Sequence, residues 1–177
     1  EDSVITALEY FLDHGHKEIG LLVGQEETAD ATPLQMDPRQ RTFQQYLTEK
    51  GLYEERFVAM GQFSTESGYQ MMEQLIQALG DDLPTAFFMA SDALAVGALR
   101  SLQEHQIAVP DRVSLISFND TSIAKYVFPA LSTVTVYTEE MGKQAIQMLR
   151  QTFQGGQPSV PYMVKLATKL TIRDSSR

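Results

Sequence analysis

The sequence predicts an α/β protein built on a doubly wound parallel sheet, and two observations carry this prediction. Residues 84–120 form a strand–helix–strand unit, in which apolar runs at 85–90 and 113–118 flank apolar side chains at helical spacing. Further strand-like and helix-like segments alternate ahead of this unit. Such alternation is typical of parallel sheets, because each helix carries the chain back to the end where the next strand starts.

The elements ahead of residue 84 are predicted from the spacing of apolar residues and from the residues that begin or end helices. Gly15 and Gly51 follow the first two predicted helices, Ser3 or Asp2 can cap the first, and Pro38 opens the second. In chain order we expect a helix at 3–14, a strand at 19–23, a polar and mobile loop at 25–36, a helix at 38–50, a strand at 57–60, a helix ending before Gly80, and then the unit at 84–120 with its helix at 92–103.

The pattern changes after Asp120. We expect an apolar loop at 126–131, a strand at 133–137, a helix at 139–153 and a strand pair at 163–167 and 169–172. The predicted helix carries a wide apolar stripe, made of Met141, Ala145, Ile146, Met148, Leu149 and Phe153. A stripe of this width needs a covering partner of its own.

Composition excludes several classes of function. Fourteen basic and twenty-three acidic side chains give a net charge of −9, which argues against this segment gripping nucleic acid phosphates by itself. The absence of cysteine excludes disulfides and thiol catalysis, and no apolar run approaches the length of a membrane span. We therefore expect a protein that does not enter a membrane.

Catalytic motifs are missing from the sequence. His14, His16 and His105 have no metal-ligand spacing, and there is no nucleophile elbow, P-loop or dinucleotide-binding glycine motif. Asp92 and Asp120 follow predicted strands, where catalytic carboxylates often lie, but without a partner base or a metal motif the sequence favours helix capping and turn formation for each. We predict that the protein is not an enzyme and uses no cofactor and no metal.

Four residues form a candidate ligand-binding set, because each follows a different predicted strand at its carboxyl end. They are Arg39, Phe63, Ser91 and Asn119. The carboxyl ends of parallel strands are where ligands bind in open α/β sheets. A fork of donors, an aromatic face, a hydroxyl and an amide together suit a neutral polyol such as a sugar.

Each of the four also has a purely structural interpretation. Arg39 could form a surface salt bridge and Phe63 could be a core aromatic. Ser91 could serve as an N-cap, and Asn119 could form an Asx-turn.

At these residues the chain resembles the effector-binding region of the lactose and galactose repressor (LacI/GalR) family of bacterial transcription regulators. The stretches that carry the resemblance are residues 15–20, Asp37-Pro38-Arg39 with Phe43, 63–69, above all 84–120, and then 129–134 and 169–173. Nearly the whole chain is covered in order, and Ser117-Phe118-Asn119-Asp120 looks like the galactose and β-galactoside repressor subgroup.

The resemblance implies a domain division. Regulators of the family have a helix-turn-helix, a hinge and a two-lobed core like that of periplasmic sugar-binding proteins. Residues 1–131 and 160–177 would form the carboxyl-terminal lobe of such a type I periplasmic-binding-protein-like fold. Residues 132–159 would be a crossover strand and helix of the amino-terminal lobe, which would also cover the apolar stripe.

The resemblance also implies roles for the four site residues. Arg39 matches the arginine that hydrogen-bonds sugar hydroxyls, and Phe63 matches the aromatic that stacks on the sugar. Ser91 and Asn119 stand where other members contact the effector. Asn119 departs from the aspartate of many members and Ser91 is shorter than the asparagine of some, so the hydroxyl pattern that is recognised can differ.

A homodimer is a further implication. The interface would use the helix from Asp92, with Ala95, Val96 and Leu99, and the loop around Tyr126, Val127 and Phe128. The loop supports this from the sequence alone, because three apolar side chains in a loop would be unusual in water. The alternative is that the loop is buried under its own lobe.

We therefore predict the sugar-sensing and dimerisation module of a cytoplasmic transcriptional repressor. Its expected partners are a sugar effector, galactose or a β-galactoside, a second copy of itself, and operator DNA bound through a headpiece outside this chain. The main alternative is a periplasmic sugar-binding protein of a transport system. A small α/β enzyme using Asp92 or Asp120 is a third reading.

Overall fold

A computed structural model describes residues 1–25, 36–153, 160 and 162–177 of the chain. The part that it describes contains a six-stranded sheet in the order β2–β1–β3–β4–β5–β6. The strands are β1 Ile19–Gly24, β2 Val58–Gly61, β3 Ala86–Met89, β4 Ser114–Asn119, β5 Ser132–Thr135 and β6 Lys169–Thr171. Neighbouring strands are parallel from β2 to β5, and β6 is antiparallel to β5. The predicted doubly wound sheet is confirmed; the loop predicted at 25–36 lies almost wholly outside the described residues.

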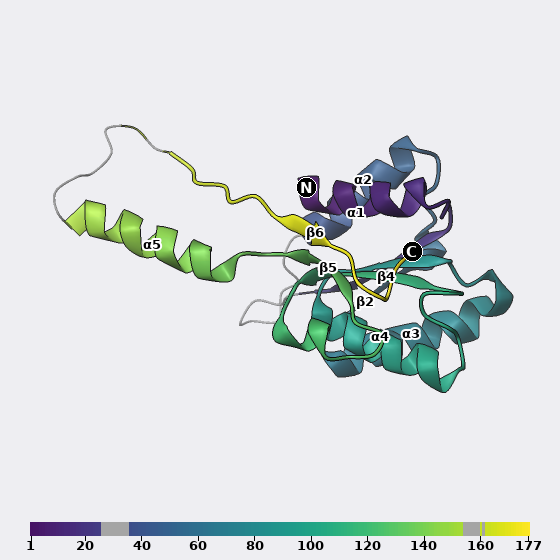
Figure 1. Ribbon diagram of the computed structural model, residues 1–177. Helices are drawn as coiled ribbons and strands as arrows, with labels where there is room; N and C mark the ends of the chain where they lie inside the picture. Colours follow the sequence, from purple (N-terminus) through teal and green to yellow (C-terminus); the bar gives the residue numbers. More distant parts are fainter. Residues whose placement is uncertain (26–35, 154–159, 161) are drawn as a thin grey trace, which may run out of the picture.

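Helices cover both faces of the sheet (Figure 1). The helices are α1 Asp2–Asp13, α2 Pro38–Glu49, α3 Thr65–Leu79, α4 Asp92–Glu104 and α5 Thr138–Phe153. The first two pack together on one face, and α3 and α4 pack together on the other. Only α5 takes no part in these layers. The first helix begins at Asp2, so neither of the predicted residues caps it; the cap position is Glu1, which makes no side-chain cap bond.

The central strands lie between the two helical layers, which explains why they read as apolar runs. Every residue of β1 and β3 is buried. Edge strand β2 is half-exposed. Because neither face of β1, β3 or β4 meets water, polar side chains that serve a ligand gather where these strands end.

Close backbone contact joins α3 to α4. A Cβ atom added to Gly68 would lie 2.3 Å from the Leu94 carbonyl oxygen, and one added to Gly97 would lie 1.9 Å from the Thr65 carbonyl oxygen. Both distances are far inside van der Waals contact, so the two helices approach this closely only because each presents a glycine.

Strand β5 belongs to this sheet. Its residues pair with β4 in the register Ile116↔Ser132 to Asn119↔Thr135, and Ser132, Thr133 and Val134 are buried. The predicted boundary after Leu131 therefore falls too early for Ser132–Thr135, because parallel pairing with β4 holds that strand in this lobe. Assignment of the helix that follows to a second lobe stays a prediction.

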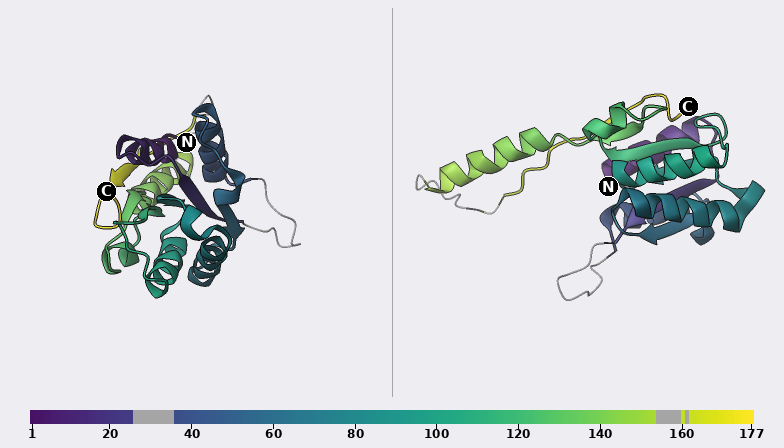
Figure 2. Two further views of the ribbon diagram at one scale, coloured as in Figure 1. Left: turned by 90° about the vertical axis from the view of Figure 1, so that its right-hand side faces the viewer. Right: turned by 90° about the horizontal axis from the view of Figure 1, so that it is seen from below.

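Helix α5 projects from the body as an arm, and the chain returns over 162–168 to β6 (Figures 1 and 2). None of the α5 residues is buried, and the Phe153 side chain is 84% exposed. The predicted strand at 163–167 is wrong, since these residues form no strand and pair with no neighbouring strand of the sheet. The apolar stripe is thus uncovered within the described residues.

Replacing Gly97 tests the contact between α3 and α4. Gly97→Ala should lower the free energy of unfolding by about 1–3 kcal/mol, because the new methyl group meets backbone atoms that can only move with their helix. Gly142→Ala is the matched control, since a Cβ at this α5 position meets nothing within 4 Å. Urea unfolding of the two variants should separate them; equal stability would contradict the role assigned to Gly97.

Candidate functional site

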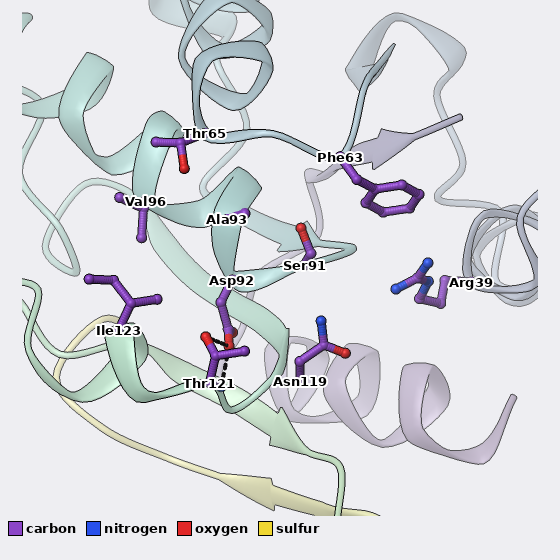
Figure 3. Close-up of a pocket in the computed structure, with 10 residues that line it drawn as sticks. All are labelled: Arg39, Phe63, Thr65, Ser91, Asp92, Ala93, Val96, Asn119, Thr121 and Ile123. Carbon is purple, nitrogen blue, oxygen red and sulfur yellow. Dashed lines mark hydrogen bonds between the residues drawn. The ribbon is translucent and has the colours of Figure 1, made fainter. Parts of the chain in front are cut away.

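The four predicted site residues line one cavity of about 510 Å³ at the carboxyl end of the sheet (Figure 3). The strand order places this cavity at the point where the chain, having gone from β1 out to β2, returns past β1 to β3. Its lining consists of Arg39, Phe63, Thr65, Ser91, Asp92, Ala93, Val96, Asn119, Thr121 and Ile123.

Arg39 is held rigidly at the start of α2. Its Nε and Nη2 donate to Asp37 Oδ1 and Oδ2 at 2.9 and 2.6 Å, and its Nη1 donates to the Ala90 carbonyl at 2.5 Å. The guanidinium carbon lies 4.9 Å from the centre of the Phe63 ring and 5.5 Å from that of Phe118. A guanidinium has five N–H donors, so two remain for a ligand.

Asp37 is the residue that fixes this geometry. It caps α2, because its Oδ1 also accepts from the Arg39 backbone N–H at 2.8 Å. Burial raises the pKa of Asp37, but the hydrogen bonds from Arg39 outweigh burial, so this pKa lies below its ordinary value. Its position just before Pro38 is the sequence signal for an N-cap, which could have revealed its role.

Phe63 and Ser91 combine a structural role with a place in the cavity. The Phe63 ring lies against the backbone of Gly24, where an added Cβ would be 2.4 Å from the ring. Ser91 caps α4 by accepting from Leu94 N–H at 3.3 Å, which leaves its own hydroxyl hydrogen free to donate. The capping interpretation of Ser91 is therefore correct, and it does not conflict with ligand binding.

Asn119 ends β4 in an unusual backbone conformation. Its φ is +112° and that of Asp120 is +58°, both in the region that favours glycine. Among the hydrogen bonds of the described residues, none involves the Asn119 side-chain amide. Figure 3 shows that amide directed toward Ser91 across the cavity.

The predicted interface residues fall into three groups by exposure. Asp92, Ala95 and Leu99 are buried inside this lobe, and their role in an interface stays a prediction. Val96 and Val127 are partly buried. By contrast, the Tyr126 and Phe128 side chains are 83% and 85% exposed, so these two apolar groups are not covered by their own lobe.

The cavity has members that sequence reasoning placed elsewhere or missed. Asp92 and Val96 were expected at an interface, whereas Thr65, Ala93, Thr121 and Ile123 carried no prediction as ligand-binding residues. Residues 91–93 and 119–121 follow strand ends directly, so proximity to those ends was a usable signal. The position of Thr65 and Ile123 depends on helix packing and on a turn, which the sequence pattern does not reveal.

Histidines do not gather at the cavity. His16 hydrogen-bonds Thr85 Oγ1 at 2.9 Å and the Arg177 carbonyl at 3.2 Å, and His105 pairs with Glu73 at 2.8 Å. Within residues 1–25, 36–153, 160 and 162–177, no cluster of three His, Cys, Asp or Glu side chains could hold a metal ion. No helix in that same part of the chain is long and apolar enough to span a bilayer.

Comparison with known proteins gives a family and close relatives. The periplasmic binding protein-like domain family matches the chain over residues 8–176. The HTH-type transcriptional regulator GalR of Streptococcus thermophilus is 49% identical over 177 residues, which are 100% of this chain and 53% of that protein. The chain therefore spans about half the length of this curated relative.

Solved structures share the fold. A LacI family transcriptional regulator from Lactobacillus casei with bound sucrose is 25% identical, with a TM-score of 0.80 over 99% of this chain and 62% of that one. The lac repressor dimer bound to operator and the anti-inducer ONPF is 26% identical, with a TM-score of 0.85 over 99% of this chain and 58% of that one.

The Asp37–Arg39 pair predicts a pH dependence of stability. Since the folded pKa of Asp37 is lowered, the pair stabilises the fold above the ordinary carboxyl pKa of 3.8, and this contribution is lost as pH falls through the lowered value. The difference in free energy of unfolding between wild type and Asp37→Asn should stay constant above about pH 5 and shrink below about pH 4. Urea unfolding across this range measures it, and a difference that holds to the lowest pH would contradict the pairing.

Proposed function

Because the chain belongs to the periplasmic binding protein-like domain family, in its LacI/GalR branch, we propose that it is the sugar-sensing lobe of a bacterial transcriptional repressor. The observation that carries this proposal is the cavity lined together by Arg39, at the start of α2, and by Phe63, Ser91 and Asn119, at or just after the carboxyl ends of β2, β3 and β4. Each of the four offers the cavity a group suited to a polyol.

The cavity chemistry supports a neutral sugar. Arg39 keeps two N–H donors, Ser91 keeps a hydroxyl hydrogen, and the Asn119 amide both donates and accepts. Phe63 supplies an apolar face for the C–H side of a sugar ring. Asp37 neutralises the positive charge of Arg39, so the site does not demand an anion.

We further propose galactose or a β-galactoside as the effector. The residues at 117–120 resemble those of the galactose and β-galactoside repressor subgroup, and the relative from S. thermophilus bears the name GalR. A related regulator from L. casei holds sucrose. A cavity of about 510 Å³ has room for either a monosaccharide or a disaccharide.

The mechanism is a population shift between two arrangements of lobes. A second lobe, covering the apolar stripe of α5, would close the cavity from the opposite side. A sugar that binds one arrangement better shifts the equilibrium toward it, and operator affinity changes through a headpiece outside this chain. Such coupling typically amounts to about 1–3 kcal/mol. A net charge of −9 agrees with DNA contact by another segment.

Two other functions have less support. A transport protein with the same fold would need no operator, but the curated relative is named as a transcriptional regulator and the lac repressor shares the fold.

An enzyme that uses Asp92 or Asp120 would need a free carboxylate. Asp92 accepts four hydrogen bonds from protein groups, and Asp120 pairs with Arg173 and Thr135. A regulatory role in the cytoplasm without catalysis is therefore the proposal.

A homodimer through the loop at 126–128 is the last part of the proposal. Tyr126 and Phe128 are exposed beside Ile123, whose side chain is also exposed. Exposed aromatic side chains that lie together are typical of a contact surface. The lac repressor, which shares this fold, is a dimer in its operator complex.

Sugar titration into the full-length protein tests the function. Galactose or lactose should release operator DNA. Arg39→Ala should weaken sugar binding by about 2–4 kcal/mol, because the charge-assisted donors of a half-buried side chain are lost. Arg41→Ala, an exposed position on the same helix, is the charge-matched control and should bind as wild type. Calorimetry and operator-binding assays give the two readouts; an operator affinity that no sugar changes would refute the proposal.

Substitution of an exposed aromatic tests the dimer. Phe128→Asp should shift the full-length protein toward monomer, because burying an unpaired carboxylate in an apolar interface is costly. Met60→Asp places the same charge at an exposed apolar position on edge strand β2 and should leave the dimer intact. Sedimentation velocity distinguishes the two results, and an unchanged dimer for Phe128→Asp would exclude this loop from the interface.

A further inference from the structure

The Asp92 carboxylate is buried, with 1% of the residue exposed, although it borders the cavity. Its Oδ1 accepts from Ser117 Oγ at 2.5 Å and from Thr133 Oγ1 at 3.0 Å. Its Oδ2 accepts from the backbone N–H and the hydroxyl of Thr121, at 2.6 and 2.8 Å. Four donors use the acceptor capacity of the carboxylate, so Asp92 has little left to offer a ligand directly.

These bonds fix the turn at residues 119–121. Thr121 is held directly by Asp92, as the dashed lines of Figure 3 show. The Asp120 backbone N–H donates to Thr133 Oγ1 at 3.3 Å, and the same hydroxyl donates to Asp92. Asp92 thus holds two successive backbone groups of the turn, one directly and one through Thr133.

The turn needs such support because its backbone is strained. Asn119 and Asp120 both have positive φ without being glycine, a conformation that costs energy and persists only where its surroundings impose it. An ion pair helps from the other side: Asp120 accepts from Arg173 Nη2 at 2.6 Å, and it also accepts from Thr135 Oγ1 at 2.8 Å. This pair draws the Asp120 side chain toward β5 and β6.

Asn119 depends on the turn for its direction. Its side-chain amide makes no hydrogen bond to the described residues, whereas its backbone carbonyl accepts from Val136 N–H at 3.3 Å. The backbone conformation therefore sets where the amide points, and Figure 3 shows it directed into the cavity. Any relaxation of φ at Asn119 would swing the amide away.

We propose that Asp92 is a positioning residue of the sugar site, which holds the left-handed turn that aims the Asn119 amide into the cavity. The proposal rests on the proposed sugar-binding function and assigns Asp92 a role that is neither ligand contact nor dimer contact. The alternative is that Asp92 stabilises the fold without affecting recognition.

Thr133→Val is the variant of choice for the test. It is nearly isosteric and suits a buried strand, yet it removes the hydroxyl that links Asp92 to the Asp120 N–H. Asp92→Ala would instead remove four hydrogen bonds at once and endanger folding. Ser114→Ala is the matched control, because Ser114 is a buried hydroxyl residue at the opposite end of β4.

The experiment is a double-mutant cycle on galactose binding by the full-length protein. Thr133→Val should weaken binding by about tenfold in the wild-type background and by less than about twofold in an Asn119→Ala background, because both changes act on the same contact. Ser114→Ala should change neither. Equal losses in the two backgrounds, or no loss in either, would overturn the positioning role.

Hydrogen exchange without sugar separates this proposal from the proposed function. In Thr133→Val the backbone N–H of Asp120 should exchange faster than in wild type, whereas Ser114→Ala should leave its exchange unchanged. Unchanged exchange at Asp120 in Thr133→Val overturns the proposal whatever the sugar result. A wild-type protein that binds no sugar refutes the proposed function, while faster exchange still supports the hold of Asp92 on the turn.

Discussion

Burial of the sheet on both faces is the constraint on which the rest of the structure depends. With helices packed above and below β1, β3 and β4, these strands carry mostly apolar side chains along their length, and the polar groups of the site follow their carboxyl ends. Parallel pairing then brings those ends to one edge. The cavity therefore depends on the same packing of helices against parallel strands that forms the core.

The positions of Arg39, Phe63, Ser91 and Asn119 could be predicted because each depends on local pattern plus one topological rule. The role of Asp92 could not. From the sequence, Asp92 was a candidate for helix capping, for catalysis or for a dimer contact. Its hydrogen-bond partners come from β4, β5 and a turn, which the sequence around Asp92 does not reveal. Ser117 and Thr133 meet because they are register partners across two strands, and register is a long-range property that the sequence does not display.

The segment after Leu131 shows the same limit in another form. Alternation predicted the strand at 133–137, and apolar spacing predicted the helix at 139–153, close to where both are found. The sequence did not show which part of the structure each element packs against: β5 pairs with β4, whereas α5 projects away from the sheet. The segment at 163–167 has the composition of a strand, but a strand also needs a neighbouring strand to pair with, which composition does not reveal.

The way α5 is joined to the body has a mechanical consequence. The chain leaves the sheet after Thr135 and re-enters it at Lys169, and these two residues are partners in the β5–β6 ladder. Whatever is carried by residues 136–168 is therefore attached by two covalent links at adjacent points. Two such links act as a hinge: they permit the arm that carries α5 to swing relative to the sheet about the line that joins them. Motion of α5 relative to the sheet would therefore be centred on this joint.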